Sequence, residues 1–268
     1  MTVAIVVADS VTALGADARG VVLVSGSHGG LVAAQYASAA GVRAAIFNDA
    51  GFGLDDAGIA GVRALDDVGM AAAAVAHTSS RIADGGDTLA RGVVSFANAH
   101  AAALGVAAGM PCRDAAERLR AGVMPTGALS IGRDARHVLD AGNAHATAIV
   151  GLDSIGSVHA DDAGRVLVIG SHGALHGGAP SSALGVDAGG ALFHDAGGGR
   201  DGAGYTRLPV LDARGMPAAT VAHTSARIGD AGSMWANGTL SRVNGAAAAR
   251  GLSIGMRAAD AARALARR

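Results

Sequence analysis

Short runs of apolar residues alternate along this chain with alanine-rich stretches whose apolar positions recur at helical spacing. The apolar runs contain few polar residues, which is typical of strands buried on both faces of a parallel sheet. Strands that alternate with helices predict an α/β protein built from Rossmann-like units with mainly parallel sheets. The expected strands lie at 3–7, 21–25, 44–48, 71–76, 147–151, 165–169, 190–194 and 217–222, and the expected helices of the first half at 30–40, 57–68 and 88–105.

The two halves of the chain carry the same polar motifs in the same order, which predicts a tandem duplication. We expect a first α/β repeat at 1–120, a connector at 121–146 and a second repeat at 147–268, with the repeats related by a pseudo-twofold axis. The clearest matches are SGSHGG (25–30) with IGSHGA (169–174), FNDAGFGLDDAG (47–58) with FHDAGGGRDGAG (193–204), and VAHTSSRIAD (75–84) with VAHTSARIGD (221–230).

Two segments break the match between the halves. The connector has no counterpart, and its sequence RDARHVLDAG is compatible with a short helix; we expect a linker, with a lid over a site as the alternative. The offset between the copies grows from 144 residues at the SHG motif to 146 at Phe47, so the second copy gained two residues between about 177 and 190. His176 lies beside this insertion and is the best candidate for a functional difference between the copies.

Composition excludes several classes of protein. A net charge of −1 and an aromatic content of 3% leave neither a basic surface nor stacking platforms, so we expect no nucleic-acid partner. All 21 basic residues are arginine. The absence of lysine removes a covalent pyridoxal-phosphate (PLP) site, a Walker A nucleotide site and a Ser–Lys dyad.

The same features predict where the protein works. No apolar stretch is long enough to span a membrane, and the N-terminal sequence is typical of a first strand rather than of a signal peptide. The single cysteine, Cys112, excludes an internal disulfide framework and is expected to be a small buried residue. We therefore expect a cytoplasmic protein with a small-molecule substrate and no membrane partner. Its alanine- and glycine-rich helices also allow a homo-oligomer.

Every repeated polar motif follows a predicted strand directly. Because ligands of open α/β sheets bind at the carboxyl ends of the strands, these loops are expected to converge on a site. In the SHG loops, glycine N–H groups approach an anion and the histidines stand at the mouth; the alternative is a tight turn with a serine cap. The candidate residues are Ser27, Ser171, His28, His172, Gly29 and Gly173. The SHGG loop resembles the GHGG loop of creatininase-like amidohydrolases, and no residue role follows from so short a match.

The DAGxGxD loops place a carboxylate at a strand end, followed by glycines and a second carboxylate. Such a pair is suited to a divalent cation or to general acid–base catalysis, and the alternative is that the first aspartate caps its own turn. The candidates are Asn48, His194, Asp49, Asp195, Asp55 and Asp201.

The HTSxRIxD loops form the longest polar identity between the copies. Arginine is suited to a bidentate grip on a substrate carboxylate, although an ion pair with the aspartate three residues later is an equally local explanation. The candidates are His77, His223, Ser79, Ser225, Arg81 and Arg227. Ser95 and Asn98 share a face of the helix expected at 88–105, and we expect them to bond a neighbouring loop.

Together these motifs predict an enzyme that acts on a small polar or anionic substrate, most simply a hydrolase of amide or related C–N bonds. Its site would lie at the strand ends near the junction of the repeats. His28, His172, His77 and His223 would act as acids, bases or metal ligands, with Asp49 and Asp195 orienting them. The serines and glycines would stabilise an oxyanion.

A divalent metal is compatible with these side chains, although no HExxH, HxH or CxxC spacing identifies one. Two alternative functions remain open. One is a cofactor-free isomerase or lyase that uses His/Asp acid–base pairs. The other is a non-catalytic protein that binds a small anion.

Overall fold

The computed structural model describes residues 2–131 and 135–267. The chain forms two compact α/β units, each with its own mixed, mainly parallel sheet. The α/β class is therefore confirmed. Unit 1 comprises Met1–Phe52, Asp56–Gly132 and Gly198–Ala203, and unit 2 comprises Gly53–Asp55, Arg133–Gly197 and Gly204–Arg268.

The sheet of unit 1 has five strands that lie in chain order. The first four strands are parallel, as predicted, and the fifth runs antiparallel to its neighbour. The strands are β1 (Ile5–Ala8), β2 (Val22–His28), β3 (Ala44–Asn48), β4 (Ala71–Val75) and β5 (Val94–Ala97).

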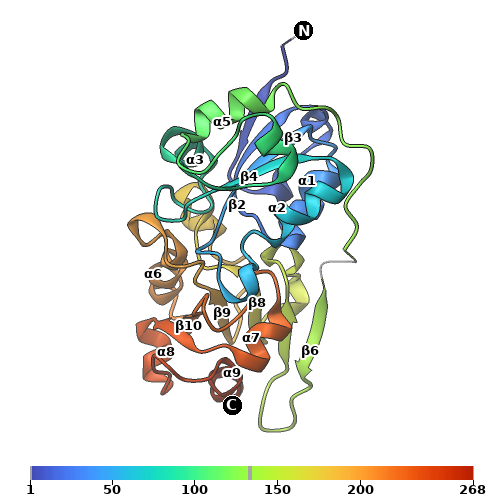
Figure 1. Ribbon diagram of the computed structural model, residues 1–268. Coiled ribbons are helices and arrows are strands. Elements are labelled where there is room, and N and C mark those ends of the chain that lie inside the picture. The colour runs from blue at the N-terminus through green and yellow to red at the C-terminus, as the bar shows by residue number, and fades with distance from the viewer. Residues whose placement is uncertain (1, 132–134, 268) are drawn as a thin grey trace. The chain divides into compact units, whose positions relative to one another are not determined.

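Helices cover both faces of this sheet (Figure 1). One face packs on α1 (Leu31–Ala39), α2 (Ala60–Ala64) and the 3-10 helices η1 (Val11–Ala13), η2 (Ala16–Ala18) and η4 (Leu65–Val68). The other face packs on α3 (Gly85–Arg91), α4 (Ala99–Ala103) and α5 (Cys112–Leu119). Phe47 and Leu23 anchor the first of these cores, and Val24 and Ile46 the second.

The single helix predicted at 88–105 is wrong. The segment divides into the end of α3, strand β5 and helix α4. Gly92 stops α3, and the alternation of Val94 and Phe96 suits an edge strand rather than a helix. Asn98 then caps α4 by accepting the backbone N–H of Ala101 at 3.0 Å.

The sheet of unit 2 has six strands, in the order β11-β10-β9-β8-β7-β6. Strands β7 to β10 are parallel, whereas β6 and β11 at the two edges are antiparallel to their neighbours. The strands are β6 (Arg136–Asp140), β7 (Ile149–Leu152), β8 (Val166–His172), β9 (Gly190–His194), β10 (Ala218–Val221) and β11 (Leu240–Val243).

The helices of unit 2 also pack on both faces of their sheet. One face carries α7 (Ala231–Asn237), α8 (Gly245–Ala249) and α9 (Ala258–Ala266). The other carries α6 (Arg207–Ala213) and the 3-10 helices η5 (Ile155–Ser157), η6 (Ala160–Asp162), η7 (His176–Gly178) and η8 (Pro180–Ser182). Two further 3-10 segments are η3 (Leu54–Asp56) and η9 (Arg200–Tyr205). The β2–β3 connection of unit 1 thus contains helix α1, whereas the β8–β9 connection of unit 2 contains the short η7 and η8.

The helix proposed within the connector is also wrong where the structure describes it. Residues Arg136–Asp140 form β6, which pairs antiparallel with β7 and is drawn as the long hairpin arm in Figure 1. The β-branched Val138 and the aspartate turn at Asp140 favour a hairpin once β7 offers a free edge. Residues 133 and 134 of that prediction lie outside the described residues.

Strand order in both sheets follows the chain instead of reversing partway. Dinucleotide-binding Rossmann folds run 3-2-1-4-5-6 and bind ligands where the order reverses. Neither sheet therefore has the reversal of strand order at which such folds bind their ligands. No helix within the described part of the chain is long and apolar enough to cross a membrane.

Candidate active site

Asp49 and His77 form a hydrogen-bonded pair at the carboxyl ends of β3 and β4. Asp49 Oδ1 lies 3.0 Å from His77 Nδ1 and also accepts the backbone N–H of His77 at 2.8 Å. The carboxylate is buried, whereas 24% of the His77 side chain is exposed. A buried carboxylate thus fixes the orientation of a partly accessible histidine.

Asp195 and His223 make the same arrangement at the ends of β9 and β10. Asp195 Oδ1 lies 3.2 Å from His223 Nδ1 and accepts the backbone N–H of His223 at 2.9 Å. Asp195 is buried, and 27% of the His223 side chain is exposed. Two of the predicted motifs, DAGxGxD and HTSxRIxD, therefore meet within each unit.

The two aspartates are ionised at neutral pH. Burial alone would raise the pKa of Asp49 and of Asp195, but the N–H donors outweigh it, with the His77 and His223 side chains the strongest, and hold both pKa values below the ordinary range. Backbone N–H groups of Gly51 and Gly197 add to this effect at 2.9 and 3.0 Å. An ionised carboxylate only accepts hydrogen bonds, so each histidine carries its proton on Nδ1. The lone pair on Nε2 can then accept a proton.

Ser95 was expected on a helix but lies on a strand near Asp49. It lies on β5, beside β4, where its hydroxyl donates to the Ala74 carbonyl at 3.3 Å, and it makes a small contribution to the lowered pKa of Asp49. Ser95 therefore bonds a neighbouring strand and not the loop that was expected, because it lies on a strand that pairs with β4.

The residue after each aspartate is an alanine in the left-handed region. Ala50 and Ala196 both have φ of 50°, a conformation that costs an L-residue about 1–2 kcal/mol. Backbone strain of this kind persists where surrounding contacts over-determine it, and it concentrates at functional sites.

Asn48 and His194 supply those contacts. Asn48 Oδ1 accepts the Ala50 N–H at 2.9 Å, and its Nδ2 approaches the Ser80 carbonyl at 3.5 Å. His194 Nδ1 accepts the Ala196 N–H at 3.1 Å, and its Nε2 donates to the Ala226 carbonyl at 3.0 Å. Asn48 in unit 1 and His194 in unit 2 thus stabilise their turns through the same two kinds of contact, and both side chains are buried. Burial lowers the pKa of His194, which keeps its ring neutral.

This equivalence makes a prediction for His194. His194→Asn preserves both contacts and should cost less free energy of unfolding than His194→Ala, which leaves a buried N–H and a buried carbonyl unpaired at about 1–3 kcal/mol each. Urea denaturation of the two variants measures the difference. Equal destabilisation would show that the two hydrogen bonds are not what His194 contributes.

Ser79 and Ser225 are engaged with the backbone. The Ser79 hydroxyl donates to the Ala76 carbonyl at 2.7 Å and accepts the Val93 N–H at 2.9 Å. The Ser225 hydroxyl donates to the Ala222 carbonyl at 2.8 Å and accepts the Thr239 N–H at 3.0 Å. Each serine holds the turn that carries its histidine, and its hydroxyl proton points to a carbonyl instead of to an imidazole.

Arg81 and Arg227 each grip a carboxylate of the protein itself. Within unit 1, Arg81 Nε and Nη2 contact one oxygen of Asp201 at 3.0 and 2.9 Å, and Arg91 reaches the same oxygen at 3.4 Å. Within unit 2, Arg227 Nε and Nη2 contact one oxygen of Asp55, both at 2.7 Å. The predicted affinity of these arginines for carboxylates is thus satisfied internally, and Asp55 and Asp201 are the carboxylates concerned.

The local ion pairs weighed as the alternative for these arginines are longer. Arg81 lies 3.9 Å from Asp84 and Arg227 lies 3.6 Å from Asp230. Asp84 instead caps α3 by accepting the Asp87 N–H at 2.8 Å.

The segments that carry these carboxylates also touch the histidine turns. Arg200 N–H donates to the His77 carbonyl at 2.8 Å within unit 1, and Leu54 N–H donates to the His223 carbonyl at 2.8 Å within unit 2. Each histidine turn is therefore fixed by a backbone hydrogen bond as well as by its aspartate.

The SHG loops are built into the ends of β2 and β8. The Gly29 N–H donates to the Asn48 carbonyl at 2.8 Å, and the Gly173 N–H to the His194 carbonyl at 2.9 Å, so the sheet uses both donors. His28 is buried, and its Nδ1 accepts the Gly30 N–H at 3.0 Å.

The serines of the two SHG loops and His172 also bond backbone N–H groups. His172 is buried and receives the Ala174 N–H at 3.4 Å. The hydroxyls of Ser27 and Ser171 accept the N–H groups of Val11 and Ile155 at 3.1 and 3.0 Å. The contacts described for these loops thus shape turns, but neither serine caps the helix that follows: α1 begins after Gly30 and η7 after Leu175, both without a side-chain cap.

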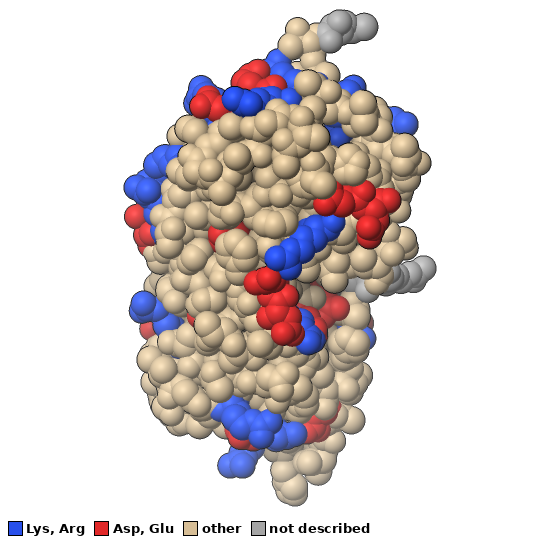
Figure 2. All heavy atoms as spheres, viewed as in Figure 1, with Lys and Arg blue, Asp and Glu red and all other residues tan. Residues whose placement is uncertain are grey.

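Within the described residues, no group of three or more His, Cys, Asp or Glu side chains is arranged to hold a metal ion. Cys112 is fully buried, and burial raises the pKa of its thiol to about 12, so it packs as a small apolar residue. On the face shown in Figure 2, charged side chains form small groups of mixed sign on a largely uncharged surface.

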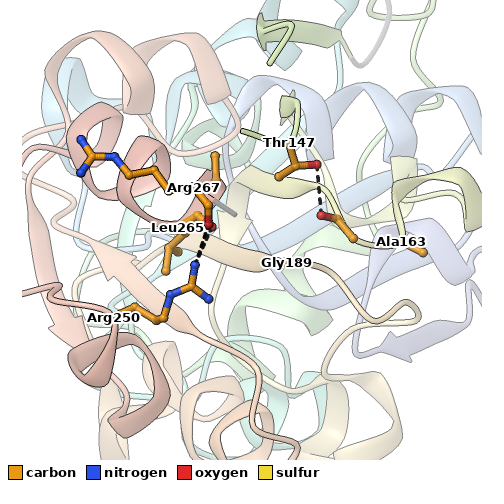
Figure 3. Close-up of a pocket in the computed structure, with 8 residues that line it drawn as sticks. Thr147, Ala163, Gly189, Arg250, Leu265 and Arg267 are labelled. Carbon is orange, nitrogen blue, oxygen red and sulfur yellow. Dashed lines mark hydrogen bonds between the residues drawn. The ribbon is translucent and has the colours of Figure 1, made fainter. Parts of the chain in front are cut away.

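Two open pockets lie away from the aspartate–histidine pairs. One, of about 400 Å³, is at the amino ends of the strands of unit 2, where Arg250 donates to the carbonyls of Leu265 and Arg267 at 3.2 and 3.1 Å (Figure 3). The other, of about 510 Å³, lies in unit 1 between the β1–β2 connection and α1. None of the site residues predicted from the sequence lines either pocket.

Comparison with protein-family models, with curated proteins and with solved structures finds no match to this chain.

Proposed function

We propose that this protein is an enzyme that hydrolyses amide or related C–N bonds in a small polar or anionic substrate. The observation that carries the proposal is the pair of buried carboxylates that hold partly exposed histidines through Nδ1, at 3.0 Å in unit 1 and 3.2 Å in unit 2. A histidine held in this way is a general base.

The reaction follows from the protonation states. Nε2 of His77 or His223 takes a proton from water as the water oxygen attacks the substrate carbonyl carbon. The tetrahedral intermediate collapses, the C–N bond breaks, and the imidazolium returns the proton to the leaving nitrogen. Asp49 and Asp195 stabilise the imidazolium, because their ionised carboxylates lie against Nδ1. The products are a carboxylic acid and an amine or ammonia.

Water is the nucleophile in this scheme, because the Ser79 and Ser225 hydroxyls donate to backbone carbonyls. A substrate carboxylate would have to replace Asp201 or Asp55 to bind Arg81 or Arg227, because these arginines already hold the two aspartates.

We also propose that the units arose by the duplication of a Rossmann-like α/β precursor. The correspondence of Asp49 with Asp195 and of His77 with His223, in both position and hydrogen bonding, supports this origin. Each unit then carries its own aspartate–histidine pair.

A screen of small linear and cyclic amides for the release of ammonia or amine tests the proposed function. Replacing His77 and His223 together by Gln should lower kcat by about 10²–10⁴-fold, the usual contribution of general acid–base catalysis. His100→Gln is the matched control, since His100 also contacts an aspartate, Asp66, at 2.9 Å but lies on the surface. Turnover that survives the double substitution would contradict the assignment of these bases.

A second reaction class uses the same base. Because no serine hydroxyl is directed at an imidazole in the described contacts, Nε2 can also remove a proton from substrate carbon, as in a cofactor-free isomerase or lyase. Deuterium from solvent that appears in recovered substrate, without release of amine, would favour this class over hydrolysis. A ligand that binds tightly and is recovered unchanged, without deuterium, would instead indicate a binding protein.

A further inference from the structure

Arg207, the first residue of α6 in unit 2, is a fully buried arginine with unsatisfied donors. None of its surface is exposed. Its Nη1 donates to the backbone carbonyls of Ser182 and Ala183. Its Nε and Nη2 are buried and have no hydrogen-bond partner among the described residues.

The charge of Arg207 is also uncompensated. Burial lowers the pKa of its guanidinium to about 10, which leaves it protonated at neutral pH. No carboxylate among the described residues opposes this effect. The neighbour described for its guanidinium is the ring of Phe193, whose centroid is 5.6 Å away. A buried charge without a counterion is costly, so an arginine in this setting indicates an anion that the protein alone does not supply.

The fold does not require a cation at this position. The corresponding residue of unit 1 is Gly61, where an added Cβ would meet the Gly30 carbonyl oxygen at 2.3 Å and the Ala34 side chain at 2.6 Å. Helix α1 thus fills in unit 1 the space that η7, η8 and Arg207 fill in unit 2. An apolar side chain would fill such a space at no electrostatic cost.

Two histidines flank the same segment. The rings of His172 and His176 meet edge to face with centroids 5.9 Å apart. The backbone N–H of His176 donates to the hydroxyl of Ser182, whose carbonyl accepts from Arg207. Arg207 also donates its own N–H to the Gly173 carbonyl at 2.9 Å, beside His172. A cation and two imidazoles therefore gather around the insertion that distinguishes unit 2.

Arg214, at the other end of α6, is a structural arginine with which Arg207 can be compared. It donates to the carbonyls of Leu184 and Val186 at 2.9 and 3.3 Å and pairs with Asp187 at 2.7 Å. Its charge is thus compensated, and it is partly exposed. Arg207 bonds carbonyls of the same segment but lacks the carboxylate and the solvent.

We propose that Arg207 is the cation of a small-oxyanion site particular to unit 2, enclosed by the segment from His172 to Ser182. The ligand is the phosphate or carboxylate group of a small molecule, because a guanidinium with two unused donors matches two oxygens of either group. The site is independent of the aspartate–histidine pairs.

Isothermal titration calorimetry with inorganic phosphate, and separately with acetate, at constant ionic strength tests the site on the full chain. The wild-type protein should bind at least one of the two anions with 1:1 stoichiometry. Arg207→Gln should weaken that binding by roughly 10–100-fold, the effect of losing a charge-assisted hydrogen bond. Arg214→Gln is the matched control and should leave the dissociation constant unchanged. The anion that binds more tightly identifies the group.

Hydrogen exchange of the wild-type protein gives a second readout that needs no variant. The bound anion should protect the amides of 173–183 and leave those of 30–40 in unit 1 unchanged. The proposal is overturned if neither anion binds the wild-type protein, if Arg207→Gln folds and binds as well as wild type, or if protection falls elsewhere.

Discussion

Replacing Asp49 and Asp195 together by Asn should reduce kcat about 10²–10⁴-fold while the protein keeps its fold. An asparagine Oδ1 can still accept the backbone N–H groups that each aspartate now accepts, at 2.8–2.9 Å from the histidine backbone. What the amide cannot do is carry the negative charge that stabilises an imidazolium at Nδ1. The same Oδ1 also faces Nδ1, so the proton stays on Nδ1 and the loss of rate comes from the missing charge. Turnover of the substrate found in the amide screen measures the loss.

The same double variant has a second signature in its acid stability. Because the folded pKa of Asp49 and of Asp195 lies below the ordinary value of 3.8, their ionisation stabilises the fold above that value. This contribution disappears as pH falls through the lowered folded pKa. The wild-type protein should therefore exceed the variant in stability at neutral pH and lose that advantage below about pH 4. A constant gap from pH 7 to pH 2 would show that the two carboxylates are not held ionised by the fold.

The strands of the parallel sheets could be predicted from sequence, because buried strands are nearly continuous apolar runs bounded by glycine and polar residues. The run at 44–48 is an example: all five of its residues are buried in β3. The antiparallel edge strands could not be predicted, since Val94 and Phe96 alternate within a segment that is otherwise alanine-rich. Alanine suits a helix and a close-packed strand alike, and the partner strand decides between them.

The candidate site was predictable as a set of loops but not as a set of roles. That Asp49 and His77 come together follows from parallel strands ending at one edge. The sequence does not show which polar groups are left to bind a ligand, because the fold decides whether a serine hydroxyl or a glycine N–H is already bonded to another part of the protein. The Gly29 N–H, expected to approach a ligand, is taken by the Asn48 carbonyl at 2.8 Å. Arg207 is a second example. Alignment of the two halves places this arginine at the position of Gly61, but nothing in the sequence indicates that it is buried.

Gly58 is expected to be the most sensitive small residue of the candidate site. Gly58→Ala should lower the free energy of unfolding by about 3 kcal/mol, the upper range for inserting atoms into a packed interior, and should reduce turnover as well. A Cβ built at Gly58 would lie 2.0 Å from the carbonyl oxygen of Asp49 and 3.1 Å from that of Phe52, so the backbone has to move. The Gly58 N–H also closes the loop by donating to Phe52 at 2.8 Å, and that bond would move with it.

Gly58→Ala should displace Asp49, the residue that orients His77, because the new Cβ would collide with the backbone carbonyl oxygen of Asp49. Thermal and urea denaturation measure the stability, and the amide assay measures turnover. Gly185→Ala is the matched control, since a Cβ there meets no atom within 4 Å, and it should change the free energy of unfolding by less than about 0.5 kcal/mol. Similar behaviour of the two variants would mean that the loop between β3 and α2 adapts to a side chain at residue 58. In that case the rigid placement of Asp49 would not be a property of this turn.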